Sequence, residues 1–457
     1  MIPSDALSDL TGMLGERLST GKSDMDLHGR SETWHAPMPP DAVAYPRDTA
    51  EVSAIVQLCA HHGVPVIPWG TGTALEGQAQ APRGGLSVDF RHMAAVLELR
   101  EDDMLARVQP GCTRTRLNEE LRATGLMFPI DPGADASLGG MASTRASGTT
   151  AVRYGTMRDQ VRALEVVLPD GRVIRTGTGA AKSSSGYDLT ALFVGAEGTL
   201  GLITELTLRL RGQPEAVAAA VCGFETTEGA IAAVILAMQS GLAPARIEYV
   251  DRATVRILNA ADGAALPETP HLLLEFHGTE ESVASEAGRM EEIVREHGGS
   301  DYRWATRAED RTRLWTMRHR AYHTILATRP RATAVVTDVC VPLSRLGEAI
   351  ARAEAEIATS PLDGPILGHV GDGNFHAILM VDRDDAGEVR EAKRLADAMV
   401  EHALALGGTA TGEHGVGLGK LHLMEREHGA GWDVMGAIKR ALDPDGIMNP
   451  GKLVRQN

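Results

Sequence analysis

Glycine-rich turns in the first half of the chain constrain the fold more than any other feature. From about residue 45 to residue 211, strand-like runs such as VPVIP, GLSVDF and LARVQPG alternate with helical stretches such as Thr49 to His62, and glycines separate them. Glycines cluster where the backbone must turn sharply or approach a ligand closely. This half of the chain therefore predicts an α+β domain built around a cofactor.

The second half of the chain has a different pattern of predicted helices and strands. After a break near Gly212-Gln213-Pro214, helix-period segments at 227–240, 280–297 and 344–357 alternate with the runs HLLLEFHG, TAVVTDVCV and FHAILMV. This β-α-β order predicts a ferredoxin-like domain. We expect an α+β fold with a two-subdomain cofactor domain over 1–212, a ferredoxin-like substrate (cap) domain over 213–428, and a C-terminal segment over 429–457 that returns to the first domain.

Composition excludes several classes of function. The formal charge of −16 argues against nucleic-acid binding, which needs a basic surface. Four cysteines without a C-x-x-C pair argue against iron–sulfur clusters and thiolate zinc, and fit a reducing compartment. The N-terminus has no apolar h-region, and no apolar stretch approaches eighteen residues. We expect a cytoplasmic protein without a transmembrane segment, at most peripheral to the inner membrane.

The first glycine loop reads PWGTGTALEG over residues 68–77 and follows the apolar run VPVI. Its glycines remove side chains from a turn, and Thr71 and Thr73 add hydroxyls. Successive exposed N–H groups in such a turn can hold a pyrophosphate. The spacing is not the G-x-G-x-x-G fingerprint. From these residues alone, a phosphate-binding loop and an ordinary tight turn both stay open.

A second glycine-rich segment, DPGADASLGGMASTRASGTTAVRYGT, covers residues 131–156. It is rich in small residues and has no regular periodicity. A loop of this length inside a compact domain is usually either functional or disordered. The flanking strand-like runs FPI and ALEVVLPDG favour an ordered loop that wraps a ligand.

Two histidines flank a hairpin signal in ILGHVGDGNFHAILM, residues 366–380. Asp372-Gly373 between apolar runs predicts a two-residue turn. That turn would place His369 directly opposite His376 on one face, with Cβ atoms roughly 4.5–5.5 Å apart. Two imidazoles at this separation suit one divalent ion, and an incidental cross-strand pair is the alternative.

Residues 407–420 read GGTATGEHGVGLGK and embed Glu413-His414 in glycine. Such a sequence permits close approach to a ligand, and a flexible surface loop is the alternative. It is not a Walker A loop, because Lys420 is followed by Leu421. Two histidines and one carboxylate make a reasonable zinc or manganese site with positions left for substrate.

An arginine lies on an apolar helix face in DRTRLWTMRHRAYHTI, residues 310–325. Helical spacing places Arg318 beside Leu314, Trp315, Ala321 and Tyr322. One interpretation is a snorkelling residue at the edge of the core. The other is a guanidinium that binds a substrate carboxylate through two hydrogen bonds.

The glycine segments carry a family resemblance. The loop P-x-G-x-G-T-x-L-x-G, the segment SLGGMAS…ASG…RYGTMRDQV and GAEGTLGLITELTLRL resemble the FAD domain of the vanillyl-alcohol-oxidase type. The resemblance implies that the first loop holds the FAD pyrophosphate and that the second lies along the diphosphate and flavin. Relatives with covalent flavin have a histidine near Thr73, so the resemblance implies non-covalent FAD. The matched positions are Pro68, Gly70, Thr71, Gly72, Thr73, Gly77, Pro132, Gly133, Gly139, Gly140, Ser143, Gly148, Gly198 and Ile203.

The pair HVGDGNFH and GEHGVG resembles a subgroup, the FAD-linked D-2-hydroxy-acid dehydrogenases, nearest the cytochrome-type D-lactate branch. TDVCVPLSRL and DPDGIMNPGK extend the match over nearly the whole chain. The resemblance implies that His369, His376 and Glu413 bind one divalent metal, zinc or manganese. It also implies that His414 is the catalytic base.

The same resemblance assigns the substrate residues. The motif L-W-x-x-R implies that Arg318 binds the substrate carboxylate, with Tyr322 one turn further on in the pocket. Asn449 resembles the asparagine that reaches back to the active site, and a simple Asn-Pro turn is its alternative.

The implied reaction is oxidation of a D-lactate-like D-2-hydroxy acid to the 2-keto acid, with hydride transfer to flavin N5. Electrons would pass to an external acceptor, a cytochrome c, a quinone or an electron-transfer flavoprotein, and a homodimer is compatible with these features. The alternatives are a glycolate-oxidase-type subunit of a complex and a flavin-free metallohydrolase.

Overall fold

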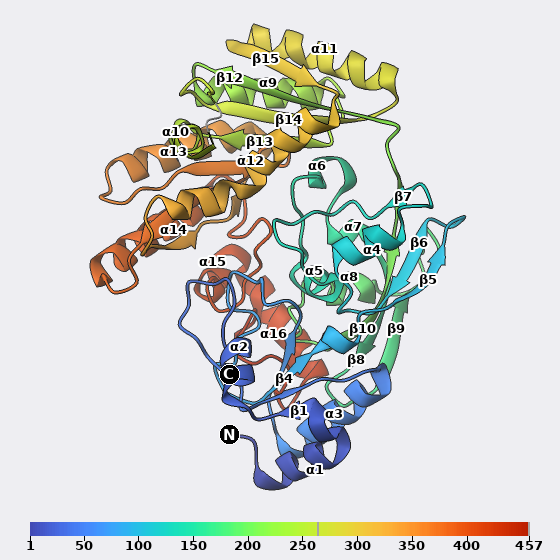
Figure 1. Cartoon of the computed structure of the whole chain (residues 1–457). Coiled ribbons are helices and arrows are strands. Elements are labelled where there is room, and N and C mark those ends of the chain that lie inside the picture. The colour runs from blue at the N-terminus through green and yellow to red at the C-terminus, as the bar shows by residue number, and fades with distance from the viewer. Residues whose placement is uncertain (263–264, 456–457) are drawn as a thin grey trace. The chain divides into compact units, whose positions relative to one another are not determined.

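The computed structural model describes residues 1–262 and 265–455 (Figure 1). Its contacts divide the chain into two compact units. The first unit comprises Met1–Ser147, Gly155–Gln213 and Glu413–Asn457, and the second comprises Gly148–Tyr154 and Pro214–Gly412. Both units mix helices with sheets, as the predicted α+β class requires. The chain re-enters the first unit at Glu413, before residue 429, and the short segment 148–154 belongs to the second unit.

The first unit begins with a small sheet of order β1-β2-β4-β3, in which β2 and β3 run parallel to β4. Helix α3 starts where the Asp48 carboxylate accepts a hydrogen bond from Glu51 N at 2.9 Å, and its apolar face buries Val52, Ile55 and Val56. The bounds are α1 Ser4–Leu14, β1 Leu18–Ser19, α2 Lys22–His28, β2 Ala42–Ala44, α3 Thr49–His62, β3 Val66–Trp69 and β4 Leu86–Asp89.

An antiparallel sheet of order β5-β6-β10-β8-β9 forms the second subdomain of this unit. Its core includes Leu164, Val166, Leu206 and Leu208, which alternate along their strands toward one face. The bounds are β5 Val96–Arg100, β6 Leu105–Val108, α4 Arg114–Glu120, β7 Leu126–Met127, α5 Leu138–Thr144, α7 Met157–Gln160, β8 Val161–Val167, β9 Val173–Gly177, α8 Leu189–Phe193, β10 Leu202–Arg209 and β11 Arg211–Gly212.

Residues 131–156 are not one long loop, so that prediction was wrong. The segment contains helix α5 and helix α6, Ala151–Tyr154. Helix α5 starts at Ser137, whose Oγ accepts a hydrogen bond from Gly140 N at 3.4 Å. Its small residues carry no amphipathic pattern, yet Leu138, Met141 and Ala142 are buried in the core. Tertiary packing therefore stabilises a helix that periodicity does not reveal.

The second unit contains the predicted ferredoxin-like motif. Four antiparallel strands lie in the order β15-β12-β14-β13, with α9 after the first strand and α11 after the third. This is a β-α-β-β-α-β arrangement with an additional helix, α10, between its second and third strands. The bounds are β12 Ala216–Phe224, α9 Thr227–Gln239, β13 Arg246–Val250, α10 Arg252–Asp262, β14 His271–Gly278, α11 Glu280–Glu296 and β15 Gly299–Ala305.

The sheet continues from β13 through β18, β19 and β16, and β17 pairs with β19. Strand alternation gives it two faces. Ile378 and Met380 pack with Trp315 and Ile325 of α12, whereas Phe375 faces α13 and α14. The bounds are α12 Ala308–Ala327, β16 Thr333–Val336, β17 Val339–Cys340, α13 Leu346–Ala358, β18 Ile366–His369, β19 Asn374–Val381 and α14 Ala386–Ala405.

The C-terminal residues complete the first unit. Helices α15, Met424–His428, and α16, Ala430–Leu442, precede a stretch that pairs with β3. Val66 N donates to Ile447 O at 2.8 Å, and Asn449 N donates to Val66 O at 2.8 Å. The tail thus extends the edge of the sheet from which the first glycine loop emerges.

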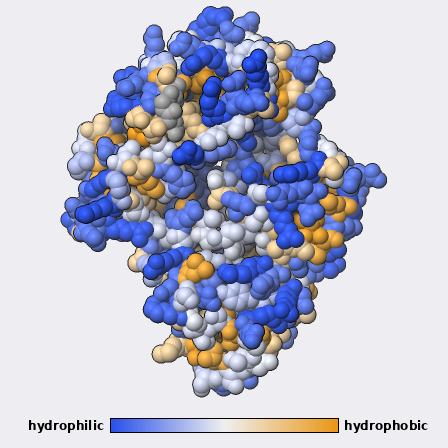
Figure 2. Space-filling model, in the orientation of Figure 1, coloured by the Kyte–Doolittle hydropathy of each residue, from blue (hydrophilic) through white to orange (hydrophobic). Residues whose placement is uncertain are grey.

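The surface is mainly hydrophilic on the face drawn in Figure 2, where hydrophobic residues form separate patches. Among the helices of the described ranges, none has both the length and the apolar character needed to cross a membrane.

Candidate active site

The glycine turns of the first unit lie against one another. A Cβ at Gly70 would overlap Ser137 Oγ at the start of α5, and a Cβ at Gly198 would overlap Pro68 Cγ. Gly198 also has a left-handed backbone, with φ of 70°. The first loop, the start of α5 and the 195–198 turn therefore pack directly on one another, and glycine is needed at Gly70 and Gly198 because protein atoms occupy the space of a side chain. Closely packed glycine turns of this kind can form a backbone cradle for a dinucleotide diphosphate.

Several predicted flavin positions belong to this cluster. Ser143 O accepts a hydrogen bond from Glu197 N at 2.9 Å, which ties α5 to the Gly198 turn. Ile203 lies buried in β10. By contrast, Gly148 is in the second unit, and Gly133 is exposed, with no described atom within 4 Å of a Cβ placed on it.

Asn449 is buried, so a simple surface Asn-Pro turn does not describe it. Its Nδ2 donates to Gln78 O at 3.0 Å and to Glu197 O at 2.6 Å, and its Oδ1 accepts from Lys452 Nζ at 2.6 Å. Burial lowers the pKa of Lys452 to about 7 and raises the pKa of Glu197. The C-terminal segment thereby holds the ends of two glycine turns together.

The loop that carries Glu413 and His414 is anchored within the first unit. Ser147 Oγ donates to Glu413 Oε2 at 2.7 Å, and Gln78 Nε2 donates to His414 O at 2.7 Å. The Glu197 carboxylate accepts hydrogen bonds from Val416 N at 2.7 Å and Gly417 N at 2.9 Å. These contacts argue against a flexible surface loop.

In the second unit, Glu248 of β13 joins two of the predicted site residues. This carboxylate is fully buried and lies 2.6 Å from His369 Nδ1 and 2.5 Å from an Arg318 guanidinium nitrogen. Strand alternation directs Glu248 to the α12 face of the sheet, whereas Tyr249 points to the other face and bonds Thr227. Strands β13 and β18 and helix α12 thus hold the His369 imidazole and the Arg318 guanidinium against the Glu248 carboxylate.

His376 is oriented by the backbone. Its Nδ1 lies 3.0 Å from Thr337 O, which can only accept, so Nδ1 carries the proton. In His369, Nδ1 faces the Glu248 carboxylate. The two ring centroids are 5.5 Å apart, at an interplanar angle of 79°. In both rings Nε2 is therefore the nitrogen that can serve as a metal ligand, because a carboxylate or carbonyl partner on the other nitrogen is typical of metal-binding histidines.

The predicted hairpin register was wrong by two residues. Leu367 pairs with His376, so His369 is diagonal to His376 rather than directly opposite. The turn covers residues 370–373, with Asp372 N donating to His369 O at 3.3 Å. The Gly373 carbonyl accepts a hydrogen bond from Val341 N at 3.0 Å, and Val341 directly follows β17. Since side chains alternate with period two, a shift of two keeps both histidines on one face.

Arg318 is not a snorkelling edge residue. It is 8% exposed and pairs with the buried Glu248. Its buried Nε has no hydrogen-bond partner among the residues that the structure describes. Tyr322 lies one turn further along α12 and is partly buried against the core that includes Trp315 and Ile325. A buried, ion-paired guanidinium with an unused donor is suited to binding an anion such as a carboxylate.

The sequence did not predict that Glu248 or the Thr337 carbonyl belongs to the site. The only signal for Glu248 was a carboxylate within the apolar strand RIEYV, and its partner His369 is 121 residues away. A backbone carbonyl such as that of Thr337 leaves no signal in the sequence.

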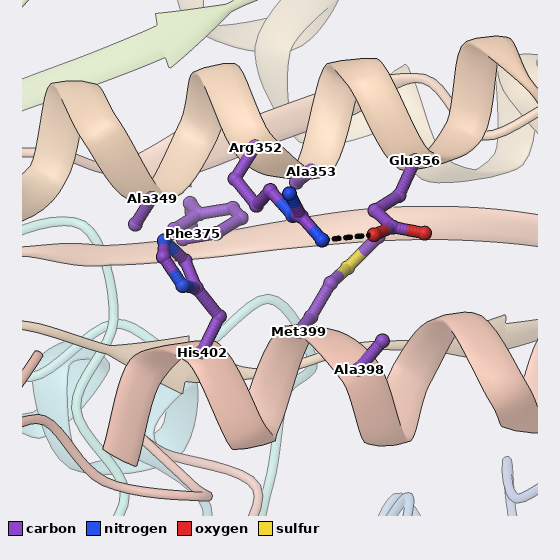
Figure 3. A pocket seen from close by; sticks show the side chains of 8 residues that line it. All are labelled: Ala349, Arg352, Ala353, Glu356, Phe375, Ala398, Met399 and His402. Atoms are coloured by element: carbon purple, nitrogen blue, oxygen red, sulfur yellow. Dashed lines mark hydrogen bonds and ion pairs between the residues drawn. The ribbon is translucent and has the colours of Figure 1, made fainter. Parts of the chain in front are cut away.

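A crevice between α13 and α14 contains none of the predicted site residues (Figure 3). Phe375 lies in this crevice, and an Arg352–Glu356 ion pair of 2.7 Å lies at its side. Because Phe375 and His376 are neighbours on a strand, the crevice is on the opposite face of the sheet from the histidines.

Two family models match the sequence. The FAD binding domain model matches residues 40–177, and the model of the C-terminal domain of FAD linked oxidases matches residues 213–453. Together they cover both units of the fold.

Relatives match over nearly the full length. The chain is 47% identical to a probable mitochondrial D-lactate dehydrogenase of Danio rerio, over 96% of this chain and 89% of that protein. It is 44% identical to a mitochondrial cytochrome-type D-lactate dehydrogenase of Arabidopsis thaliana, over 99% and 80%. Among solved structures, 4-ethylphenol oxidase from Gulosibacter chungangensis is 19% identical, with a TM-score of 0.81 over 98% of this chain and 96% of that one, which supports the fold alone.

Proposed function

Because the chain belongs to the family of FAD-linked oxidases, we propose that it oxidises a D-2-hydroxy acid of the D-lactate type to the 2-keto acid. The observation that carries the proposal is the buried carboxylate of Glu248 between Arg318 and His369. It places an anion-binding guanidinium and a metal-type imidazole together, as a 2-hydroxy carboxylate requires.

The cradle formed by Pro68, Gly70, Gly198 and the start of α5 would hold FAD. It fits the cofactor because close packing at Gly70 and Gly198 brings the glycine turns together, and the backbone N–H groups of such turns can bind a diphosphate. When bound, the flavin supplies the hydride-accepting chemistry of the reaction at N5. Thr73 stands near the position of the covalent histidine in other members, so acid precipitation should release all flavin into the supernatant.

His369 and His376 would hold a divalent metal, zinc or manganese, through Nε2. The donor set fits, since each ring has its Nδ1 oriented by a carboxylate or a carbonyl. Such an ion supplies Lewis-acid polarisation of the substrate 2-hydroxyl.

Chain connectivity supports Glu413 as the third ligand. Thr411 Oγ1 donates to Asp338 Oδ2 at 2.7 Å, and a Cβ on Gly412 would overlap Asn374 Nδ2, so Gly412 is packed beside the strand that carries His376. Glu413 is the next residue, and consecutive Cα atoms are only about 3.8 Å apart.

We assign substrate binding, proton transfer and support of the glycine turns to four further residues. The Arg318 guanidinium binds the substrate carboxylate, and Tyr322 lines the pocket beside it. The His414 imidazole takes the proton from the 2-hydroxyl, because a histidine can accept a proton near neutral pH. Asn449 keeps the turns at Gln78 and Glu197 in place. The electrons then leave to an external acceptor, such as a cytochrome c or a quinone.

Anaerobic reduction tests this function. Purified protein should show a flavin spectrum, and D-lactate without an acceptor should bleach it, while L-lactate should not. A panel of D-2-hydroxy acids, glycolate among them, would rank the substrates. A colourless protein, or a flavin that no 2-hydroxy acid reduces, would refute the proposal.

A further inference from the structure

The segment Gly148–Tyr154, here called the strap, follows the flavin-domain helix α5 in the chain but packs within the second unit. At its C-terminal end, Tyr154 Oη lies 2.7 Å from His277 Nδ1, and His277 Nε2 lies 2.8 Å from Glu275 Oε1. The Arg153 guanidinium also donates to Ala243 O. The strap is therefore fixed to β14 and to the residues that precede β13.

The middle of the strap lies against the turn that carries the histidines. A Cβ at Gly371 would lie 2.6 Å from Val152 Cγ2 and 3.1 Å from Val152 Cβ. Gly371 is not among the residues with left-handed backbone, so glycine is needed there for space rather than for conformation. Val152 thus packs directly against the backbone of the turn between His369 and His376.

The residue before the strap contacts the third proposed ligand. Ser147 Oγ donates a hydrogen bond of 2.7 Å to Glu413 Oε2, and Ser147 is joined directly to Gly148. One continuous stretch of eight residues, 147–154, therefore contacts Glu413 through Ser147 and the histidine turn through Val152.

We propose that residues 147–154 position the metal ligands: Val152 buttresses the turn between His369 and His376, and Ser147 orients the Glu413 carboxylate. This inference rests on the proposed metal site. Outer groups that orient ligands typically change metal affinity about 10- to 100-fold when they are removed. Ser147 and the strap are then positioning residues and are not proposed as metal ligands.

A packing swap tests the role of Val152. In flavin-loaded protein stripped of metal, Gly371→Ala should weaken binding of Zn²⁺ or Mn²⁺ by about 10-fold or more, with unchanged flavin content. Adding Val152→Ala removes the Cγ2 atom that the new methyl meets and should restore most of the affinity. Gly347→Ala is the matched control, because the nearest atom to a Cβ there is 3.8 Å away in the same unit.

Ser147→Ala tests the contact made by the residue that precedes the strap. It should weaken metal binding in the parent and in the rescued double variant by the same factor, with no change in melting temperature. Parent-like metal affinity in Gly371→Ala, or no rescue by Val152→Ala, would overturn the inference while leaving the proposed function intact. A parent protein whose metal binding does not depend on His376 would overturn both.

Discussion

Replacing Arg318 with lysine separates substrate binding from structural support. Lysine keeps a positive charge beside the buried Glu248, so the buried ion pair is not left with an uncompensated carboxylate. Breaking a buried pair costs about 3–5 kcal/mol, and this cost should not appear in Arg318→Lys. We expect its free energy of unfolding to stay within about 1 kcal/mol of the parent.

Arg318→Lys should instead weaken the binding of the substrate carboxylate. The guanidinium has a second set of donors, including the buried Nε that lacks a partner among the described residues, and lysine cannot reproduce this fork. Loss of one charge-assisted hydrogen bond to the substrate carboxylate costs about 1.5–3 kcal/mol. Since about 1.4 kcal/mol is a factor of ten, kcat/KM for D-lactate should fall roughly 10- to 100-fold.

The assay compares D-lactate with D-lactamide, which lacks the charge, in parent and variant. Arg318→Lys should reduce turnover of D-lactate and have little further effect on D-lactamide. Glu248→Gln is the structural control and should lower the free energy of unfolding by about 3–5 kcal/mol. Normal kinetics with D-lactate, or equal losses on both substrates, would refute the role of Arg318.

Three further predictions concern the cofactors and the C-terminal segment. His376→Ala should reduce activity by orders of magnitude while flavin stays bound, and chelation of the parent should reproduce this loss until zinc or manganese is restored; near-normal turnover would exclude a metal role. Gly198→Ala should lower the ratio of flavin to protein absorbance, because the methyl overlaps Pro68, whereas Gly12→Ala, with no described atom near its Cβ, should not. The folded-state pKa of Lys452 is about 7, below its unfolded value of 10.5. Between these two pH values the unfolded chain binds more protons than the folded chain. The stability contributed by Lys452 therefore rises with pH in this range. Urea unfolding at pH 6.5 and 9.0 should therefore show Lys452→Met losing more stability relative to the parent at the higher pH, and a pH-independent difference would contradict this.

Sequence periodicity predicted which residues share a face but not how strands pair. His376 follows His369 by seven positions, and any turn with an even number of residues keeps the two on one face. The turn covers residues 370–373, and Gly373 O accepts a hydrogen bond from Val341 N, two positions that no local pattern connects. The face was therefore predictable and the register was not.

Segments of clear periodicity gave the α+β class and the ferredoxin-like motif, whereas α5 was missed. Its glycines, alanines and serines have no amphipathic pattern, and the helix forms because Leu138 and Met141 reach a core supplied by distant strands. Glu248 was missed for a related reason: a single carboxylate in an apolar strand has meaning only beside its partners.

The pairing of β3 with residues 447–449 has a consequence for biosynthesis. Asn449 bonds Gln78 across 371 positions of sequence, and Lys452 bonds the carbonyl of Gln80 across 372. A ribosome therefore completes the entire second unit before the segment that stabilises the first glycine loop has emerged. Tight flavin binding should then be a post-translational event, and clipping the chain after α16 should release flavin from a protein whose second unit stays folded.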